Sequence, residues 1–148
     1  DEEIALMFAQ VFKSYEKAIV TSLQDADLII IMAGMGWLTG TMAAPLTAKI
    51  CRGFNAPVVA VGTMPFAWEG ELPSENASFG ISELRKYVDM PVVHSLEQMI
   101  PYRQKTTSIR EAFDLGINLI QQSALSLADQ FHRRDPGSWR RYAMNFKP

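Results

Sequence analysis

The sequence predicts an α/β fold, in which a Rossmann-like parallel sheet lies between two layers of helices. Continuous apolar runs at residues 28–33 and 58–61 are typical of strands that are covered on both faces, and a third short strand is predicted at residues 92–94. Segments with helical periodicity separate these runs, and right-handed crossovers would place the helices on both faces of the sheet. Three strands are few for this class, so we expect the sheet to be part of a larger one.

The first two predicted helices flank the first strand. Residues 2–23 carry apolar side chains at helical spacing, which we expect to form one buried stripe: Ile4, Met7, Phe8, Val11, Phe12, Tyr15, Ile19 and Leu23. A shorter helix is predicted at residues 42–52, with Pro45 in its first turn and Gly53 after its end.

Two further helices follow the second and third strands. The first is predicted at residues 74–88. The second begins at Ser108, because the spacing of Ser108 and Glu111 is that of a capping box. This helix continues to Phe131 and has one apolar face. We therefore divide the chain into a domain at residues 1–131 and a basic C-terminal tail at residues 132–148.

Composition and charge exclude several classes of function. The chain has 148 residues with 48% hydrophobic and 20% charged side chains, as in an ordinary globular domain. A formal net charge of −2 gives no electrostatic case for a nucleic-acid partner or an anionic membrane. No apolar run approaches the roughly 20 residues of a membrane span. The single cysteine, Cys51, excludes an intrachain disulfide and suits the cytoplasm, and the histidines and Cys51 have no metal-site spacing.

A glycine-containing loop follows the first predicted strand and is the main candidate for a binding site. Its residues are Gly34, Met35, Gly36, Trp37, Leu38, Thr39, Gly40 and Thr41. The order strand, loop, helix directs backbone N–H groups and the positive end of the helix dipole at one place, which favours phosphate. Glycines permit a close approach of the ligand, and the two threonines add hydroxyl donors. The same spacing also describes a tight strand–helix turn, so both interpretations stay open on the loop alone.

The longer segment Gly34–Pro45 resembles the signature of the tubulin/FtsZ family of GTP-binding, filament-forming proteins. A common FtsZ form is GMGGGTGTGAAP, and this sequence departs from it only at Trp37, Leu38 and Met42. Further matches follow in the family's order: Thr63–Gly70 is similar to the TKPFxFEG loop, Gly80–Leu84 to GITEL, and Glu111–Phe113 to the DAF of the central helix. The resemblance covers roughly residues 23–131.

The resemblance implies GTP or GDP as the ligand, with or without Mg²⁺. It places the phosphates on the loop of residues 34–41, the ribose at Glu69 and the guanine near Phe113. Asn118 stands where the family has an acid that reads guanine, and its uncharged amide implies weaker guanine selectivity. Pro73 stands where the family has an arginine.

Two of the loop's departures from the family concern the backbone. Trp37 and Leu38 replace glycines, and a side chain at either position strains the backbone if φ must be positive there.

Two parts of the family's pattern have no counterpart in this sequence. The first is an initial strand with another glycine-rich loop, and the second is the acidic loop NxDxxD after the central helix. We therefore expect no catalytic residue and no metal site, and no GTP turnover by this chain alone. Without that first strand, residues 28–33 would form an open edge, which we expect to pair with a second copy or with an N-terminal segment supplied as a partner chain.

The leading hypothesis is a divergent FtsZ-like GTP-binding protein, related to cell-division GTPases and incomplete relative to the full nucleotide-binding domain. The alternative is a degenerate FtsZ-like module for interaction or assembly that binds no nucleotide. A Rossmann-type enzyme is disfavoured, because residues 55–63 contain no acid that could bind a ribose.

Overall fold

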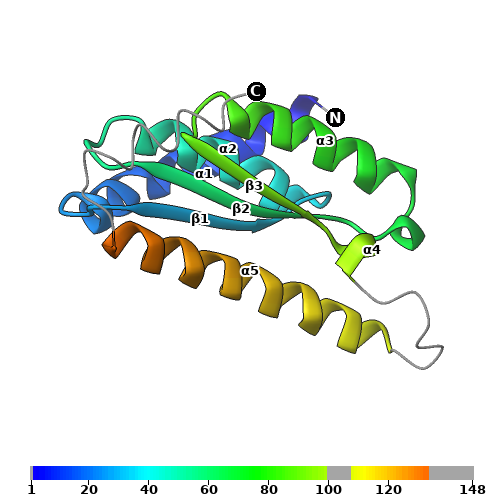
Figure 1. Cartoon of the computed structure of the whole chain (residues 1–148). Coiled ribbons are helices and arrows are strands. Elements are labelled where there is room, and N and C mark those ends of the chain that lie inside the picture. The colour runs from blue at the N-terminus through cyan, green and yellow to red at the C-terminus, as the bar shows by residue number, and fades with distance from the viewer. Residues whose placement is uncertain (1, 100–107, 134–148) are drawn as a thin grey trace.

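The computed structural model describes residues 2–99 and 108–133, and it has three layers (Figure 1). The elements are α1 (Glu2–Leu23), β1 (Ile29–Gly34), α2 (Leu38–Cys51), β2 (Val58–Met64), the 3₁₀ turn η1 (Ala67–Glu69), α3 (Glu71–Arg85), β3 (Met90–Ser95), α4 (Leu96–Met99) and α5 (Ile109–His132). A parallel sheet lies between helices on both faces, which confirms the predicted α/β class.

The sheet has the order β1-β2-β3, and both pairings are parallel. Ile29 is paired with Val58 at one end of the β1–β2 ladder, and Gly34 with Thr63 at the other. The central strand β2 is buried along its length except at Met64, because it has a strand on each side and helices above and below. Among the described residues, β1 and β3 are the two edges of the sheet.

Alternation along β2 divides the core into two layers. Val58 and Ala60 point to the side of α2 and α3, where they meet Ala44, Ala48 and Leu84 in one apolar cluster. Their neighbours on β2, the fully buried Val59 and Val61, point to the other side and pack with Leu127 and Phe131 of α5. Residues 58–61 of β2, which are covered on both faces, are therefore continuously apolar, as predicted.

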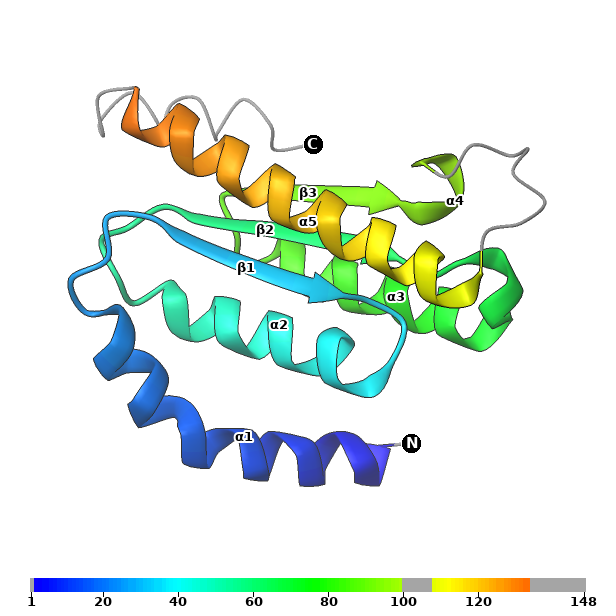
Figure 2. The ribbon, with the colours of Figure 1, turned by 90° about the horizontal axis from the view of Figure 1, so that it is seen from below.

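The expected buried stripe on α1 is wrong for half of its residues. Phe8, Phe12, Ile19 and Leu23 are half-buried, whereas Ile4, Met7, Val11 and Tyr15 are exposed. The reason is that α1 packs beside α2 in the helical layer and projects beyond the β1 edge (Figure 2). A neighbouring helix covers a narrower band of α1 than a sheet would. Helical spacing in the sequence does not distinguish a helix that packs on another helix from one that packs on a sheet.

The boundaries of two helices also differ from the prediction. The helix α2 begins at Leu38, four residues earlier than expected, so Pro45 lies inside it and not in its first turn. The N-cap Trp37 has no side-chain oxygen, so no capping residue marks the start of the helix in the sequence. The helix α3 begins at Glu71, three residues before the predicted start.

The predicted capping box of α5 is confirmed. Ser108 Oγ accepts a hydrogen bond from the Glu111 backbone N–H at 3.2 Å, and Glu111 Oε2 accepts one from the Ser108 N–H at 2.6 Å. Hydrogen bonding of the Glu111 carboxylate to the backbone and the side chain of Ser108 lowers the pKa of this carboxyl group. The predicted tail at residues 132–148 lies outside the described residues except for His132 and Arg133, which follow the buried Phe131. No helix in the described part of the chain is long and apolar enough to cross a membrane.

We predict that Gly80→Ala destabilises the domain by about 1–3 kcal/mol through overpacking. A Cβ atom at residue 80 would lie 2.7 Å from Thr41 Cγ2 and 2.9 Å from Met35 Cε, so α3 could no longer approach the start of α2. Intrinsic helix propensity has the opposite sign and favours alanine. Urea unfolding measures the change. Ser78→Ala, at an exposed position of the same helix, is the control and should be nearly neutral; a Gly80→Ala variant as stable as the wild type would contradict the packing argument.

Candidate functional site

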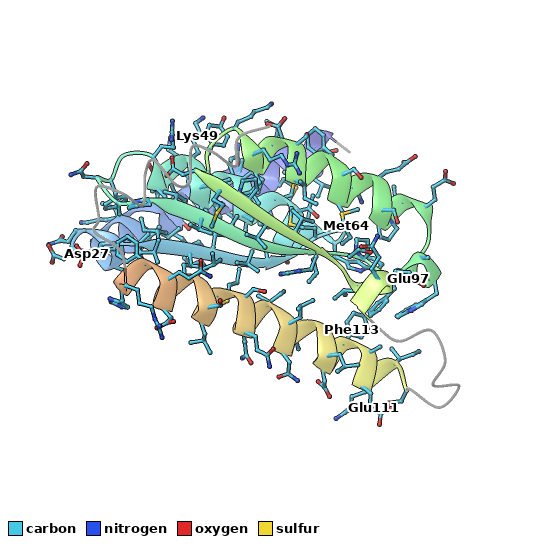
Figure 3. The ribbon with its side chains drawn as sticks, in the orientation of Figure 1. Asp27, Lys49, Met64, Glu97, Glu111 and Phe113 are labelled. Atoms are coloured by element: carbon cyan, nitrogen blue, oxygen red, sulfur yellow. The ribbon has the colours of Figure 1, made fainter. Side chains whose placement is uncertain are left out.

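The candidate site lies at the carboxyl ends of the three strands. The glycine loop follows β1, the loop with η1 follows β2, and α4 follows β3 (Figure 2). The first turns of α5, which carry Phe113, lie at the same end, and Figure 3 shows Glu97 of α4 nearby. In open parallel sheets this edge is where ligands bind, because loops and helix N-termini meet there.

The glycine loop is fixed from within. The Met35 N–H donates a hydrogen bond to the Thr63 carbonyl at 3.0 Å, which continues the β1–β2 ladder past the strand end. Gly36 has φ = +111°, a conformation that favours glycine, and its N–H donates to the buried Thr41 Oγ1 at 2.9 Å. The Gly36 carbonyl accepts a hydrogen bond from Asn76 Nδ2 at 3.4 Å. These contacts give the loop one defined shape.

The helix α2 begins directly against the end of β1. A Cβ atom at residue 40 would lie 1.9 Å from the Gly34 carbonyl oxygen, so only glycine fits there. The first turn of a helix leaves its N–H groups without partners in the helix, and here Trp37 supplies no capping oxygen to them. The N–H groups of Leu38, Thr39 and Gly40 therefore form a donor set at the positive end of the helix dipole, beside the exposed Thr39 side chain.

The backbone strain considered for Trp37 and Leu38 does not arise. Trp37 is extended, with φ = −102° and ψ = 160°, and Leu38 is the first residue of α2. Within the described residues, positive φ values occur only at Gly36 and Gly70. Two bulky residues thus replace family glycines without cost to the backbone.

Glu69 joins the loop after β2 to the glycine loop. Its Oε1 atom accepts a hydrogen bond from the Phe66 N–H at 2.8 Å, and its Oε2 atom accepts one from Trp37 Nε1 at 2.8 Å. Trp37 itself is 63% exposed. Sequence reasoning placed both residues in the site but not their contact, because residues 32 positions apart give no local signal of it.

Phe113 belongs to an aromatic cluster at the same edge. Its ring meets Phe66 and Trp68 edge-on, with centroid distances of 5.8 and 5.9 Å, while the Phe66 and Trp68 rings stack at 5.2 Å. Phe113 remains 42% exposed, so it contributes to packing and also presents ring surface at the site.

Asn118 lies on a different side of α5. Gly116 packs against Leu96, and two residues further along a helix the side chain is turned by about 160° from that direction. The exposed Asn118 therefore points away from the packed side of α5. A role for it in reading guanine stays a prediction.

Pro73 packs against the glycine loop. Its carbonyl oxygen would lie 3.0 Å from a Cβ atom at residue 36, and the residue is buried. The proline is tolerated because it occupies the first turn of α3, where its missing N–H leaves no helical bond unmade. A buried proline that packs against the loop thus stands at the position where the resemblance places an arginine.

Two other features of the described residues do not extend the site. They contain no group of three or more His, Cys, Asp or Glu side chains that could hold a metal ion. A hollow of about 370 Å³ is lined by residues that include Asp25, Asp27, Phe54 and Pro57. These residues precede β1 and β2, so the hollow lies at the amino ends of the strands, opposite the glycine loop.

Comparison with known proteins identifies the family. A profile of the "Tubulin/FtsZ family, GTPase domain" matches residues 7–103. The cell division protein FtsZ of Buchnera aphidicola subsp. Baizongia pistaciae is 38% identical over 107 residues, which are 72% of this chain and 28% of that protein. The Haemophilus influenzae FtsZ is 36% identical, over 72% of this chain and 25% of its own length. The chain thus spans about a quarter of these relatives.

Solved structures agree with the sequence comparison. An empty FtsZ dimer of M. jannaschii superposes with a TM-score of 0.69 and 31% identity, over 75% of this chain and 32% of that one. A GTPgS-bound protofilament of CetZ2 from Haloferax volcanii gives a TM-score of 0.68 and 26% identity, over 81% and 37% of the two chains. The sheet with helices on both faces therefore corresponds to one part of these larger folds. The chain belongs to the Tubulin/FtsZ family and comprises part of its GTPase domain.

Proposed function

We propose that this chain is a divergent FtsZ-like protein that binds GTP or GDP at the glycine loop, residues 34–41. The observation that supports this most directly is the start of α2, where three N–H groups without helical partners lie beside the Gly34–Gly40 contact at the ligand-binding edge of the sheet. Glu69 and Phe113 lie at the same edge. By the resemblance to the family, we assign the ribose to Glu69 and the guanine to Phe113.

The described residues fit the phosphate part of the ligand best. Backbone donors and the Thr39 hydroxyl suit an anion and need no cationic side chain, which agrees with Pro73 in place of an arginine. Magnesium commonly binds through the phosphates themselves with few protein ligands, so a site without a carboxylate cluster is compatible with Mg²⁺ that arrives with the nucleotide. A cytoplasmic location belongs to the same proposal, since the buried Cys51 is a free thiol.

We propose further that residues 28–33 pair with another chain, either a second copy or an N-terminal segment of the same kind of domain. The N–H groups of Ile29 and Met35 donate to Pro57 and Thr63 on the β2 side. Backbone groups alternate in direction along a strand, so those of Ile30 and Met32 point away from β2. Nothing in the described part of the chain pairs with this edge.

The alternative proposal, a module for assembly that binds no nucleotide, rests on the same edge and on α1. Ile4, Met7, Val11 and Tyr15 expose a continuous apolar band that adjoins the packed residues of α1. Solved relatives include a structure described as a dimer and one described as a protofilament. Nucleotide binding and assembly are separable by experiment.

Nucleotide binding should raise the thermal midpoint of the chain. We expect GTP and GDP at millimolar concentration to stabilise the wild type by a measurable shift, because a ligand of the folded state adds its binding free energy to stability. ATP and CTP serve as comparisons. Thr39→Ala removes an exposed hydroxyl of the donor set and should reduce the shift, whereas Thr21→Ala, exposed on α1, should leave it unchanged. A chain that no nucleotide stabilises would favour the assembly module.

We predict no GTP turnover by the 148-residue chain alone. Hydrolysis needs a positioned water or base and stabilisation of the transition-state charge. The residues after Phe131 match no acidic NxDxxD loop, and Pro73 supplies no cation. Phosphate release is measured at steady state beside a Gly36→Ala, Thr39→Ala double variant. Release clearly faster than that of the variant would show that the chain carries catalytic groups of its own.

The wild type should not be a free monomer at high micromolar concentration. Light scattering after size exclusion should give a mass of two or more chains, because an exposed apolar edge strand recruits a partner. Met32→Pro removes only an outward N–H and should yield the monomer, since proline is tolerated on edge strands. Met32→Ala keeps that N–H and is the matched control. A monomeric wild type, with slow amide exchange at residues 28–33, would contradict edge pairing.

A further inference from the structure

One hydrogen bond joins the glycine loop to the loop that follows β2. Trp37 is the N-cap of α2, next to the three N–H groups proposed to bind phosphate. Its indole Nε1–H donates to Glu69 Oε2 at 2.8 Å, and Glu69 Oε1 already accepts the Phe66 N–H at 2.8 Å. Both oxygens of the carboxylate are therefore engaged within the protein itself.

We propose that Trp37 determines which part of a nucleotide contributes to binding, because its indole competes with the ribose hydroxyls for Glu69. This inference rests on the proposed binding of nucleotide at the glycine loop. The indole N–H occupies one acceptor position of Oε2, and a ribose hydroxyl that takes this position must displace the indole. The phosphate groups meet no such competitor, since the N–H groups of α2 are not used by Trp37.

The geometry allows the exchange to occur without a change in the fold. Trp37 is 63% exposed, so its side chain can rotate into solvent without opening the core. Its backbone is extended and unstrained, and the loop is held by separate contacts, those from Met35 to Thr63 and from Gly36 to Thr41. Glu69 also remains oriented by the Phe66 N–H when the indole leaves. The indole is thus a removable partner on a carboxylate that stays in place.

The consequence is a site that favours phosphate over ribose. In the wild type each ribose contact with Glu69 replaces a hydrogen bond of similar kind, so the hydroxyls add little affinity. Removal of the indole N–H should restore their contribution. Pyrophosphate, which lacks a ribose, should be insensitive to the change.

A cycle of two protein forms and two ligands tests this proposal. The chain and its Trp37→Phe variant, which keeps an aromatic ring but loses the N–H donor, are titrated with GDP and with 2′,3′-dideoxy-GDP by calorimetry. We expect the wild type to bind the two ligands with nearly equal affinity. We expect the variant to bind GDP about three- to tenfold more tightly than the dideoxy ligand, the value of one hydrogen bond to a partly exposed carboxylate. Pyrophosphate should bind both forms alike.

A second measurement detects the hydrogen bond without any ligand. The indole N–H resonance of Trp37 is identified by its loss in Trp37→Phe, and Glu69→Gln should shift it. In the wild type GDP should move the same resonance toward the position of a solvent-exposed indole, and pyrophosphate should leave it in place.

The possible results separate this proposal from the proposed function. Equal preference for GDP over the dideoxy ligand in both protein forms would leave nucleotide binding intact and overturn the competition. Weaker GDP binding by Trp37→Phe, without regard to the ribose hydroxyls, would show that the indole holds the nucleotide and would also overturn it. Failure of wild type and variant to bind GDP or pyrophosphate would overturn the proposed function and this inference together.

Discussion

The contact between Gly40 and the Gly34 carbonyl is the constraint on which the site depends. A Cβ atom at residue 40 would lie 1.9 Å from that oxygen, so the helix can begin this close to the strand end only with glycine. The closeness turns Thr41 back toward the loop, where its hydroxyl accepts the Gly36 N–H. Gly80 extends the same principle, because its missing side chain lets α3 reach Thr41. The missing side chains of Gly40 and Gly80 thus fix where the N-terminus of α2 points.

The two ends of the candidate site are prepared to different degrees. At the end proposed to bind phosphate, the N–H groups at the start of α2 have no capping partner, and the loop that carries them is already ordered by its own hydrogen bonds. At the end proposed to bind the ribose, Glu69 is held by the Phe66 N–H and by Trp37. A preorganised donor set binds an anion with little ordering cost, whereas a hydroxyl that donates to Glu69 competes with hydrogen bonds that are already made. Trp37, which replaces a family glycine, therefore contacts Glu69 at the proposed ribose end and puts no strain on the backbone at the proposed phosphate end.

Local patterns predicted the elements, and tertiary contacts decided what the patterns left open. The apolar runs located three strands, and the spacing of Ser108 and Glu111 located the start of α5, because each signal depends only on neighbouring residues. The family motif located the glycine loop. Helical periodicity showed which residues of α1 share a face. It did not show that α1 packs mainly against α2, which leaves half of these residues exposed. The bond between Trp37 and Glu69 joins two loops through the fold, so no spacing in the sequence could reveal it.

The exposed half of α1 and the open edge of β1 are two parts of one feature. In a parallel sheet, helices cover strands, and a helix without a strand beneath it exposes the face that a strand would contact. The helix α1 packs against α2 in the helical layer and projects past β1 (Figure 2), so its band of Ile4, Met7, Val11 and Tyr15 is not covered by the sheet. A strand added beside β1 would gain hydrogen bonds from Ile30 and Met32 and, being on the same side of the molecule, would come beneath the overhanging helix. One partner can therefore satisfy the backbone edge and the apolar band together, which is a stronger reason for association than either surface alone.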